Sequence, residues 1–333
     1  MKTKHVTLLV LTVASLAFAD NAQTEKKPTP PQGAAQTMQK VNYATPAAEA
    51  DAAFKRFFTV PFERKAMSVL YSVTSYYHGK GHVWGNSEMH FRKGVEEGFE
   101  AFKADMRLSS DGEIILCHDE GFTYDENGRI ARFDKTNYEA IHDMPLEKIL
   151  KLEYNIPFQG QYLHPCTLDT MLAVCEEYGK IAYLTLRPEA WREDVAKRMA
   201  ELLVKHNMQH RTIINMFLGK NVAIATKKVV SKYIPGLVFC HTQRGNVPLT
   251  KELIDESAAE GYQIICLYYT DQIDTITPEL CEYAAGKGIR IWCWAVGNEE
   301  KTKNCLAKGV SGFQMGSRDI NAAVVDKMLH PEK

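Results

Sequence analysis

Residues 99–119 read FEAFKADMRLSSDGEIILCHD, and this stretch decides both the expected fold and the expected chemistry. Successive side chains of a strand point to opposite faces, so Lys103 and Asp105 share one face of the first limb. An Asp111-Gly112 turn folds the chain back, and His118 returns toward them. A cation, a carboxylate and an imidazole that meet at a strand end indicate phosphate or sugar chemistry, although a purely structural polar cluster has the same pattern.

Short apolar runs alternate with amphipathic helical patterns along the rest of the chain. Eight strands are expected, at Ser68–Val73, Phe99–Asp105, Ile181–Leu186, Thr212–Phe217, Gly236–Cys240, Gln263–Leu267, Arg290–Ala295 and Ser311–Gln314. Repeated strand–helix alternation favours a parallel sheet, and eight strands favour closure into a (β/α)8 TIM barrel with its site at the C-terminal strand ends. The link from Arg107 to Ile114 is too short for a parallel crossover, so Glu113–His118 is predicted to form a hairpin after the second strand.

The longest interruption of this alternation is residues 119–180, which are rich in turn residues and poor in strand patterns. We interpret them as an insertion that carries two short helices, at Asn137–Leu152 and Leu168–Tyr178. Since they follow the expected active-site end of the barrel, they form either a lid or a structural flap.

The N-terminus has the pattern of a secretory signal peptide over residues 1–19, with a basic start, an apolar run and a small-x-small end. This pattern predicts export to the periplasm or the extracellular space, and the apolar run is too short to be a transmembrane segment. Residues 20–54 have the composition of a flexible leader. The barrel is then expected over 55–325, followed by a tail at 326–333.

The charge balance limits the kinds of binding partner, and the positions of the cysteines indicate whether they form disulfides. The 40 basic and 41 acidic residues give a net charge of −1 without a basic block, which argues against a nucleic acid partner. An anionic small molecule must therefore be held by local charges. The eight cysteines lie mostly in apolar strand-like or helix-like runs, so free buried thiols are expected in spite of the predicted export. Cysteine and histidine residues show no paired zinc-ligand spacing.

Further motifs accompany residues 99–119. They are Tyr77-His78-Gly79-Lys80-Gly81, Asn86-Ser87-Glu88, Tyr183-Leu184-Thr185-Leu186-Arg187, Trp292-Cys293-Trp294-Ala295-Val296-Gly297-Asn298 and Gly309-Val310-Ser311-Gly312. In this order and spacing, roughly over residues 68–320, the chain resembles the glycerophosphodiester phosphodiesterase family. The resemblance implies a phosphoric diester hydrolase in which two histidines, His78 and His118, act as acid and base. His82 is the alternative to His78.

The resemblance also implies substrate-binding residues. Trp294 matches the tryptophan that lines the family's substrate pocket, and it could equally fill the core. Asn86 matches the asparagine of the family's Glu-Asn-Thr motif, where bracing the loop that carries His78 is an alternative to binding substrate.

The metal site departs from the family pattern. The family binds a divalent cation, Mg²⁺ or Ca²⁺, through three carboxylates, and here Lys103 and Thr185 replace two of them while Asp105 remains. One carboxylate holds such an ion poorly. Lys103 and Arg187 are cations that can bind phosphate in its place, as in the similar metal-free bacterial phosphatidylinositol phospholipases C.

We therefore expect a secreted phosphodiesterase that hydrolyses a glycerophosphodiester or sugar-phosphodiester by histidine acid–base catalysis, with Lys103 and Arg187 in place of metal ligands. Two alternatives remain open. The first is an inactive family member that binds an anionic or sugar ligand. The second is an enzyme that cleaves a glycosidic linkage.

Overall fold

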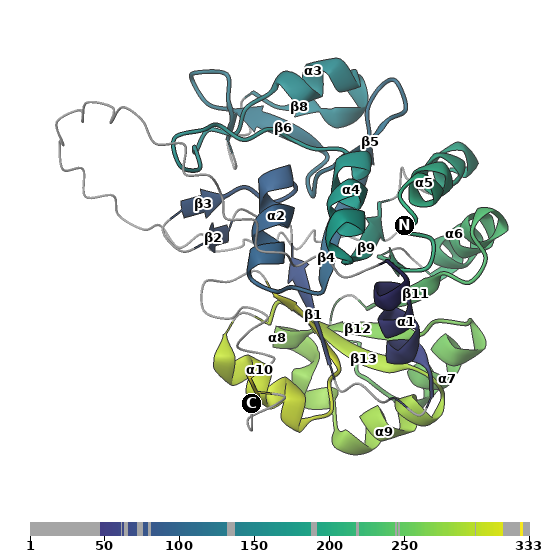
Figure 1. Ribbon diagram of the computed structural model, residues 1–333. Coiled ribbons are helices and arrows are strands. Elements are labelled where there is room, and N and C mark those ends of the chain that lie inside the picture. The colour runs from purple at the N-terminus through teal and green to yellow at the C-terminus, as the bar shows by residue number, and fades with distance from the viewer. Residues whose placement is uncertain are drawn as a thin grey trace, which may run out of the picture. The chain divides into compact units, whose positions relative to one another are not determined.

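The described residues build a closed barrel of eight parallel strands (Figure 1). The computed structural model describes residues 47–60, 62, 66–71, 76–78, 81–131, 137–187, 192–217, 220–243, 245, 247–296, 298–315 and 327–328. The barrel strands are β1 (Met67–Tyr71), β4 (Ala101–Leu108), β9 (Ile181–Leu186), β10 (Thr212–Met216), β11 (Val238–Thr242), β12 (Ile264–Tyr268), β13 (Arg290–Trp294) and β14 (Gly312–Met315). Because β1 pairs with both β14 and β4, the sheet closes, which confirms the predicted TIM barrel.

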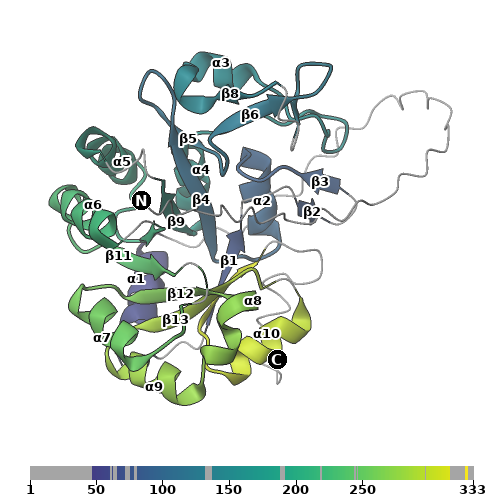
Figure 2. The ribbon, with the colours of Figure 1, turned by 180° about the vertical axis from the view of Figure 1, so that it is seen from behind.

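Helices surround this barrel (Figure 2). They are α2 (Glu88–Glu96), α4 (Leu168–Tyr178), α5 (Glu193–Lys205), α6 (Lys220–Tyr233), α7 (Lys251–Ala259), α8 (Tyr269–Gln272) with η3 (Ile273–Thr275), α9 (Pro278–Gly286) and α10 (Glu299–Ala307). Ser87, Thr167, Thr250, Thr277 and Asn298 each accept a backbone N–H three residues later, which satisfies an otherwise unpaired donor and sets where α2, α4, α7, α9 and α10 begin. The apolar faces of these helices pack on the strands in one continuous core.

One more helix, α1 (Ala47–Phe58), packs against residues near the beginnings of the barrel strands. Phe57 is fully buried beside Trp292, with ring centroids 6.3 Å apart. Asp51 pairs at 2.5 Å with Arg211, whose side chain is fully buried. Helix α1 begins inside the range 20–54 that the sequence predicts as a leader, so residues 47–54 are helical. The predicted signal peptide and the rest of the leader lie outside the described residues, as does most of the expected tail.

The hairpin after the second barrel strand is confirmed, since β5 (Ile114–Leu116) pairs antiparallel with β4. The following residues form a small sheet of β6 (Gly121–Tyr124), β7 (Ile130–Ala131) and β8 (Glu139–Ala140), and then η1 (Ile141–Asp143) and α3 (Leu146–Lys151). The predicted helix at 137–152 is thus wrong in its first half. Pro145 precedes α3, and a proline restricts the residue before it to extended conformations, which prevents one continuous helix. The predicted helix at 168–178 is confirmed as α4.

This insertion has its own apolar core, in which Trp84 stacks on Tyr154 with ring centroids 4.8 Å apart. The core also includes Ile115 of β5, so the small sheet is tied to the barrel hairpin. Earlier in the chain, between β1 and α2, β2 (Tyr76–His78) and β3 (Gly81–Val83) form a separate antiparallel pair.

All eight cysteines are free thiols, and seven of them are buried, as the sequence predicts. Burial raises the pKa of Cys117, Cys175 and Cys281 to about 12. Among the described residues, no helix combines the length and the hydrophobicity that crossing a bilayer requires.

Candidate active site

A small cavity lies at the C-terminal ends of the barrel strands, where TIM-barrel enzymes build their active sites. Its volume is about 80 Å³. The described residues that line it are Lys103, Asp105, His118, Thr185, Arg187, Asn215, Phe217, Thr242, Trp294 and Gln314. The structure therefore brings together five predicted site residues that lie up to 191 positions apart in the sequence, from Lys103 to Trp294.

Asp105 is the centre of the charged part of this cavity. Its side chain is fully buried, and it contacts a cation through each carboxylate oxygen. Lys103 Nζ donates to Oδ2, and the Arg187 NH2 group lies 2.7 Å from Oδ1. Burial alone would raise the pKa of Asp105, but the charges of Lys103 and Arg187 outweigh burial and hold it below the usual value. Asp105 is therefore a carboxylate, and the lining carries one anion between two cations.

Arg187 keeps donor capacity for a ligand. Its side chain is only 11% exposed, and its Nε is buried without a hydrogen-bond partner in the described part of the chain. A buried donor left unpaired is costly, and a guanidinium can bind phosphate through two parallel hydrogen bonds. The unpaired Nε thus indicates room for an acceptor that none of the described residues provides.

His118 reaches the same cavity from the end of the hairpin. The Cys117 N–H donates to the Asp105 carbonyl at 2.9 Å, and Arg107 donates to the His118 carbonyl at 2.8 Å. These two bonds fix the backbone that carries the imidazole. The ring Nδ1 lies 2.8 Å from an oxygen of Asp119, and the side chain is 34% exposed, so it is accessible to a substrate.

The structure does not describe the side chain of the other predicted acid–base residue, His78 or its alternative His82. His78 ends β2 and its backbone pairs with Gly81, but its side chain and that of His82 lie outside the described residues. The choice between these two histidines therefore stays a prediction.

A neutral hydrogen-bonded network extends from the cavity into the barrel. Asn215 donates to Thr185 Oγ1 at 3.0 Å and accepts from Thr242 Oγ1 at 2.5 Å. Gln314 donates to the Tyr183 hydroxyl at 2.9 Å. Sequence reasoning missed Asn215, Thr242 and Gln314. The only signal was a polar residue near the C-terminal end of each of these mostly apolar strands.

Aromatic rings form one wall. Trp294 stacks on Tyr268 with centroids 4.2 Å apart, and Phe217 meets it edge-on at 6.3 Å. The following residue, Ala295, has a φ of 62°, in the left-handed region. Trp292, by contrast, is fully buried against Tyr183 with centroids 5.7 Å apart, and it fills the core near the beginnings of the strands.

Asn86 is not among the described residues that line this cavity. It is buried with a φ of 59°, and its carbonyl accepts a hydrogen bond from the Cys166 thiol at 3.2 Å. It precedes Ser87, the residue that caps α2. This position fits a role in shaping the loop before α2, and its predicted contact with substrate stays a prediction.

The residues present do not fit a divalent cation. Both oxygens of Asp105 contact cationic groups, and Thr185 lies opposite it where a carboxylate would be needed. No group of three His, Cys, Asp or Glu side chains within the described residues could hold a metal ion. Mg²⁺ and Ca²⁺ need several oxygen ligands, and beside Asp105 this lining provides a cation at 103 and a neutral hydroxyl at 185.

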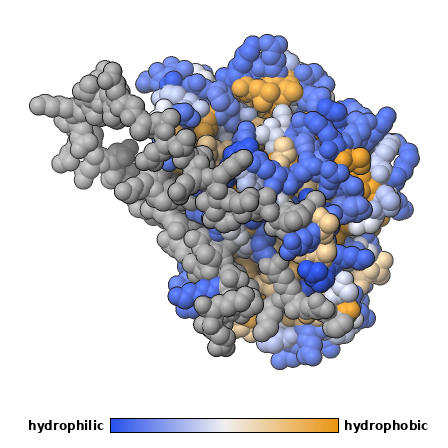
Figure 3. All heavy atoms as spheres, in the orientation of Figure 1, coloured by the Kyte–Doolittle hydropathy of each residue, from blue (hydrophilic) through white to orange (hydrophobic). Residues whose placement is uncertain are grey.

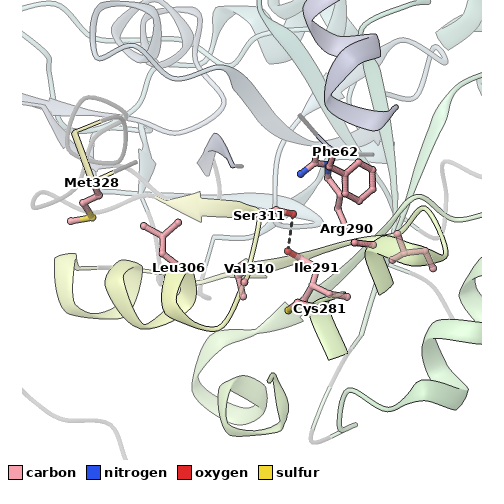
Figure 4. Close-up of a pocket in the computed structure, with 11 residues that line it drawn as sticks. Phe62, Cys281, Arg290, Ile291, Leu306, Val310, Ser311 and Met328 are labelled. Atoms are coloured by element: carbon pink, nitrogen blue, oxygen red, sulfur yellow. Dashed lines mark hydrogen bonds between the residues drawn. The ribbon is translucent and has the colours of Figure 1, made fainter. Parts of the chain in front are cut away.

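A larger cavity, of about 420 Å³, lies near the beginnings of β13 and β14 (Figure 4). Apart from Arg290 and Ser311, its described lining is apolar or sulfur-bearing. The Arg290 guanidinium lies between the rings of Phe57 and Phe62, at 3.7 and 3.9 Å, and donates to the Phe57 carbonyl at 2.7 Å. Arg290 thus has a structural role, and this cavity is not a candidate active site.

Comparison with known proteins gives the family of the chain. Residues 77–315 match the model of the glycerophosphoryl diester phosphodiesterase family. The chain belongs to this family. A glycerophosphodiester phosphodiesterase of Caldanaerobacter subterraneus is 24% identical over 232 residues, which cover 67% of this chain and 84% of that protein.

Solved structures share the fold. A Silicibacter pomeroyi protein, described as a candidate glycerophosphoryl diester phosphodiesterase, has a TM-score of 0.65 at 17% identity, covering 84% of this chain and 98% of its own. A phosphodiesterase from Oleispira antarctica, solved in complex with the product sn-glycerol-3-phosphate, has a TM-score of 0.60 at 14% identity, covering 78% and 96%.

Proposed function

We propose that this member of the glycerophosphoryl diester phosphodiesterase family hydrolyses a glycerophosphodiester or sugar-phosphodiester without a bound divalent cation. The observation that carries the proposal is the contact of Asp105 with both Lys103 and Arg187 inside a cavity that also exposes His118. The N-terminal sequence pattern supports an exported enzyme that works in the periplasm or outside the cell.

Lys103 and Arg187 supply fixed positive charge. In hydrolysis of a phosphodiester, negative charge develops on the phosphoryl oxygens, and donors already aimed at that position stabilise the transition state. Arg187 Nε is such a donor, and Asp105 holds both cations in place. The low pKa of Asp105 keeps it ionised, so it does not act as a proton donor in this reaction.

His118 is the proton-transfer group on the described side of the cavity. A histidine can remove a proton from water or protonate the leaving oxygen near neutral pH. The contact with Asp119 orients the ring through Nδ1 and leaves Nε2 for the substrate. The second group that such a reaction needs is His78 or His82.

The neutral network and the aromatic wall suit the alcohol part of the substrate. Asn215, Thr242 and Gln314 offer hydrogen-bonding groups beside the charged cluster, and Trp294 offers a flat apolar face for glycerol or sugar carbons. Binding of sn-glycerol-3-phosphate to the Oleispira antarctica relative supports a substrate that contains a glycerol phosphate group.

The glycosidic alternative is disfavoured by the lining. Glycoside hydrolases use a pair of carboxyl groups, and Asp105 is the single carboxylate among the described lining residues. It is moreover buried between two cations. An inactive binding protein remains the main rival, and an assay decides between the two.

The test uses protein stripped of metal by a chelator and a panel of glycerophosphodiesters and phosphoinositides. We expect turnover that survives chelation and that disappears in His118→Asn. Turnover that is lost on chelation and restored by Mg²⁺ or Ca²⁺ would show that a metal is required. Saturable binding without any turnover would support the inactive alternative.

A further inference from the structure

We infer that the hydroxyl of Thr185 is a further hydrogen-bond donor to the phosphate group in this cavity, and that a hydrogen-bonded network in the barrel fixes its direction. The inference rests on the proposed function, because it concerns the same cavity. It goes further in assigning a catalytic role to a neutral side chain of the lining.

Thr185 lies beside the groups that supply positive charge. It precedes Arg187 by two positions at the end of β9, and both side chains line the cavity. On the other side it is paired with Asp105 of β4. Thr185 is buried, and the cavity has a volume of about 80 Å³. A ligand oxygen that accepts from Arg187 in so small a space is therefore close to the Thr185 hydroxyl.

Asn215 determines which way this hydroxyl points. The Asn215 amide lies between two hydroxyls, 3.0 Å from Thr185 Oγ1 and 2.5 Å from Thr242 Oγ1. A separation of 2.5 Å suits an O–H···O bond, whereas N–H···O bonds span about 2.7–3.2 Å, so the amide oxygen faces Thr242 and Nδ2 faces Thr185. Asn215 therefore donates to Thr185. The hydrogen of the Thr185 hydroxyl must then point to a different acceptor.

The described residues do not supply that acceptor. Among them, Asn215 is the one recorded hydrogen-bond partner of Thr185 Oγ1. Asp105, the nearest carboxylate by strand pairing, already contacts both Lys103 and Arg187. Because a buried hydroxyl without an acceptor is costly, a ligand oxygen in the cavity is the favourable partner.

The network continues from Asn215 into the barrel core and holds the amide in place. Thr242 Oγ1 lies 3.8 Å from Cys240 Sγ, and the Tyr183 hydroxyl donates to that sulfur at 3.2 Å. Gln314 donates to the same hydroxyl at 2.9 Å. All of these side chains are buried, so their hydrogen bonds are strong and support one another. Asn215 and Thr242 are therefore positioning residues for the donor.

The donor acts where negative charge grows. In the transition state of phosphodiester hydrolysis this charge develops on the phosphoryl oxygens, and a fixed donor stabilises it. Thr185 keeps its hydrogen throughout, so it acts by hydrogen bonding and not by proton transfer. A neutral hydroxyl adds this stabilisation without adding a third cation beside Lys103 and Arg187.

The kinetic experiment compares Thr185→Val, which keeps the shape without the hydroxyl, with Thr185→Ser, which keeps the hydroxyl. On a glycerophosphodiester that the unmodified protein hydrolyses, we expect Thr185→Val to lower kcat by about 10²-fold with a much smaller change in KM. Thr185→Ser should retain most of the turnover. The matched control is Thr226→Val on α6, a buried threonine outside the cavity lining, which should change neither parameter. No loss in Thr185→Val, or equal losses in both Thr185 variants, would overturn the inference.

Thr242→Val tests the network, because it removes the donor to the Asn215 oxygen and leaves Thr185 unchanged. We expect a smaller loss of kcat, which Thr242→Ser restores. In Thr185→Val the same change should cost nothing further, since the hydroxyl that it positions is already absent. Independent, additive losses would show that the network does not act through Thr185. If Thr185→Val does not fold, Thr185→Ala takes its place in both comparisons.

A binding measurement distinguishes failure of this inference from failure of the proposed activity. Orthovanadate can adopt the five-coordinate geometry of the phosphoryl transition state, and its binding is followed by vanadium NMR without any turnover. We expect Thr185→Val to bind it at least about tenfold more weakly than the unmodified protein and Thr185→Ser. Such weakening without turnover of any diester by the unmodified protein would refute the proposed activity and leave the inference standing. Turnover by the unmodified protein, with equal kcat and equal vanadate binding in Thr185→Val, would refute only the inference.

Discussion

Thr185 lies directly opposite Asp105 in the parallel pairing of β4 with β9. Both line the cavity, and Lys103 lies two residues before Asp105 on the same face of β4. Carboxylates at 103 and 185 would therefore flank the carboxylate at 105. The chain differs from a three-carboxylate metal site by two side chains, whereas its backbone already has the required arrangement.

We predict that Lys103→Glu combined with Thr185→Glu creates binding of Ca²⁺ or Mg²⁺, because three converging carboxylates attract a hard divalent ion. Isothermal titration calorimetry measures it directly. The matched control, Lys103→Gln with Thr185→Gln, has the same side-chain size without the charge and should bind no metal. A folded glutamate variant that takes up no metal would show that the three positions do not share one site.

Lys103→Met and Arg187→Met should each reduce turnover by about 10²–10³-fold, the usual effect of removing one donor to developing charge. Each also leaves Asp105 with a single cation, and breaking a buried ion pair typically costs about 3–5 kcal/mol of folding free energy. We expect less than this, because the second cation remains.

Chemical denaturation and turnover assays separate the two effects. The added change Asp105→Asn in Lys103→Met removes the carboxylate that still pairs with the buried Arg187, so the double variant should recover neither stability nor activity. Recovery of both would mean that Lys103 contributes only to folding.

Stability at acid pH should report on Asp105. Its pKa is lowered in the folded state, so it adds stability above its unfolded pKa of about 3.9, and this stability is lost as the pH falls through the folded value. The difference in unfolding free energy between the unmodified protein and Asp105→Asn should be constant above about pH 5 and should shrink below about pH 4. Asp143→Asn, at an exposed position, is the control. A difference that does not depend on pH would contradict the ion pairs.

Gly312, the first residue of β14, lies too close to the Trp292 ring to carry a side chain. A Cβ there would lie 2.2–2.4 Å from three ring atoms of Trp292, which is fully buried. We predict that Gly312→Ala lowers the unfolding free energy by about 1–3 kcal/mol, the usual effect of overpacking a core. Gly286→Ala, at the end of α9 with open space around the new Cβ, should be neutral or stabilising. Equal melting temperatures for both variants would refute the contact.

The barrel could be predicted from sequence because its signal is local. Each strand is a short apolar run, and the 105–118 hairpin follows from a chain segment too short to cross the sheet. The region 137–152 could not be predicted in the same way. Two-residue strands such as β8 have no periodicity, and they form because β6 lies beside them. Similarly, α1 begins in an alanine-rich stretch with no large apolar residue before Phe54, and it is held by contacts of Phe57 and Asp51 with distant residues.

The charged half of the site was predictable because Lys103, Asp105 and His118 lie on one hairpin. Arg187 was predictable because it ends the motif at residues 183–187 that the chain shares with the family. The neutral half was not. Asn215 and Thr242 are polar residues of mostly apolar strands, and their hydrogen bond exists only because β10 and β11 are neighbours. Pairing between strands is a tertiary property, so no local pattern contains it.

Ala295, directly after Trp294, adopts the left-handed backbone conformation that alanine disfavours by about 1–2 kcal/mol. The chain holds this energy at the rim of the cavity, where it fixes the direction in which the strand leaves the barrel. A glycine at position 295 would adopt this conformation without strain and would raise stability. It would also make the backbone after Trp294 more flexible, and so would hold the Trp294 ring less firmly. Stability of the fold and a fixed position of the Trp294 ring therefore place opposite demands on residue 295.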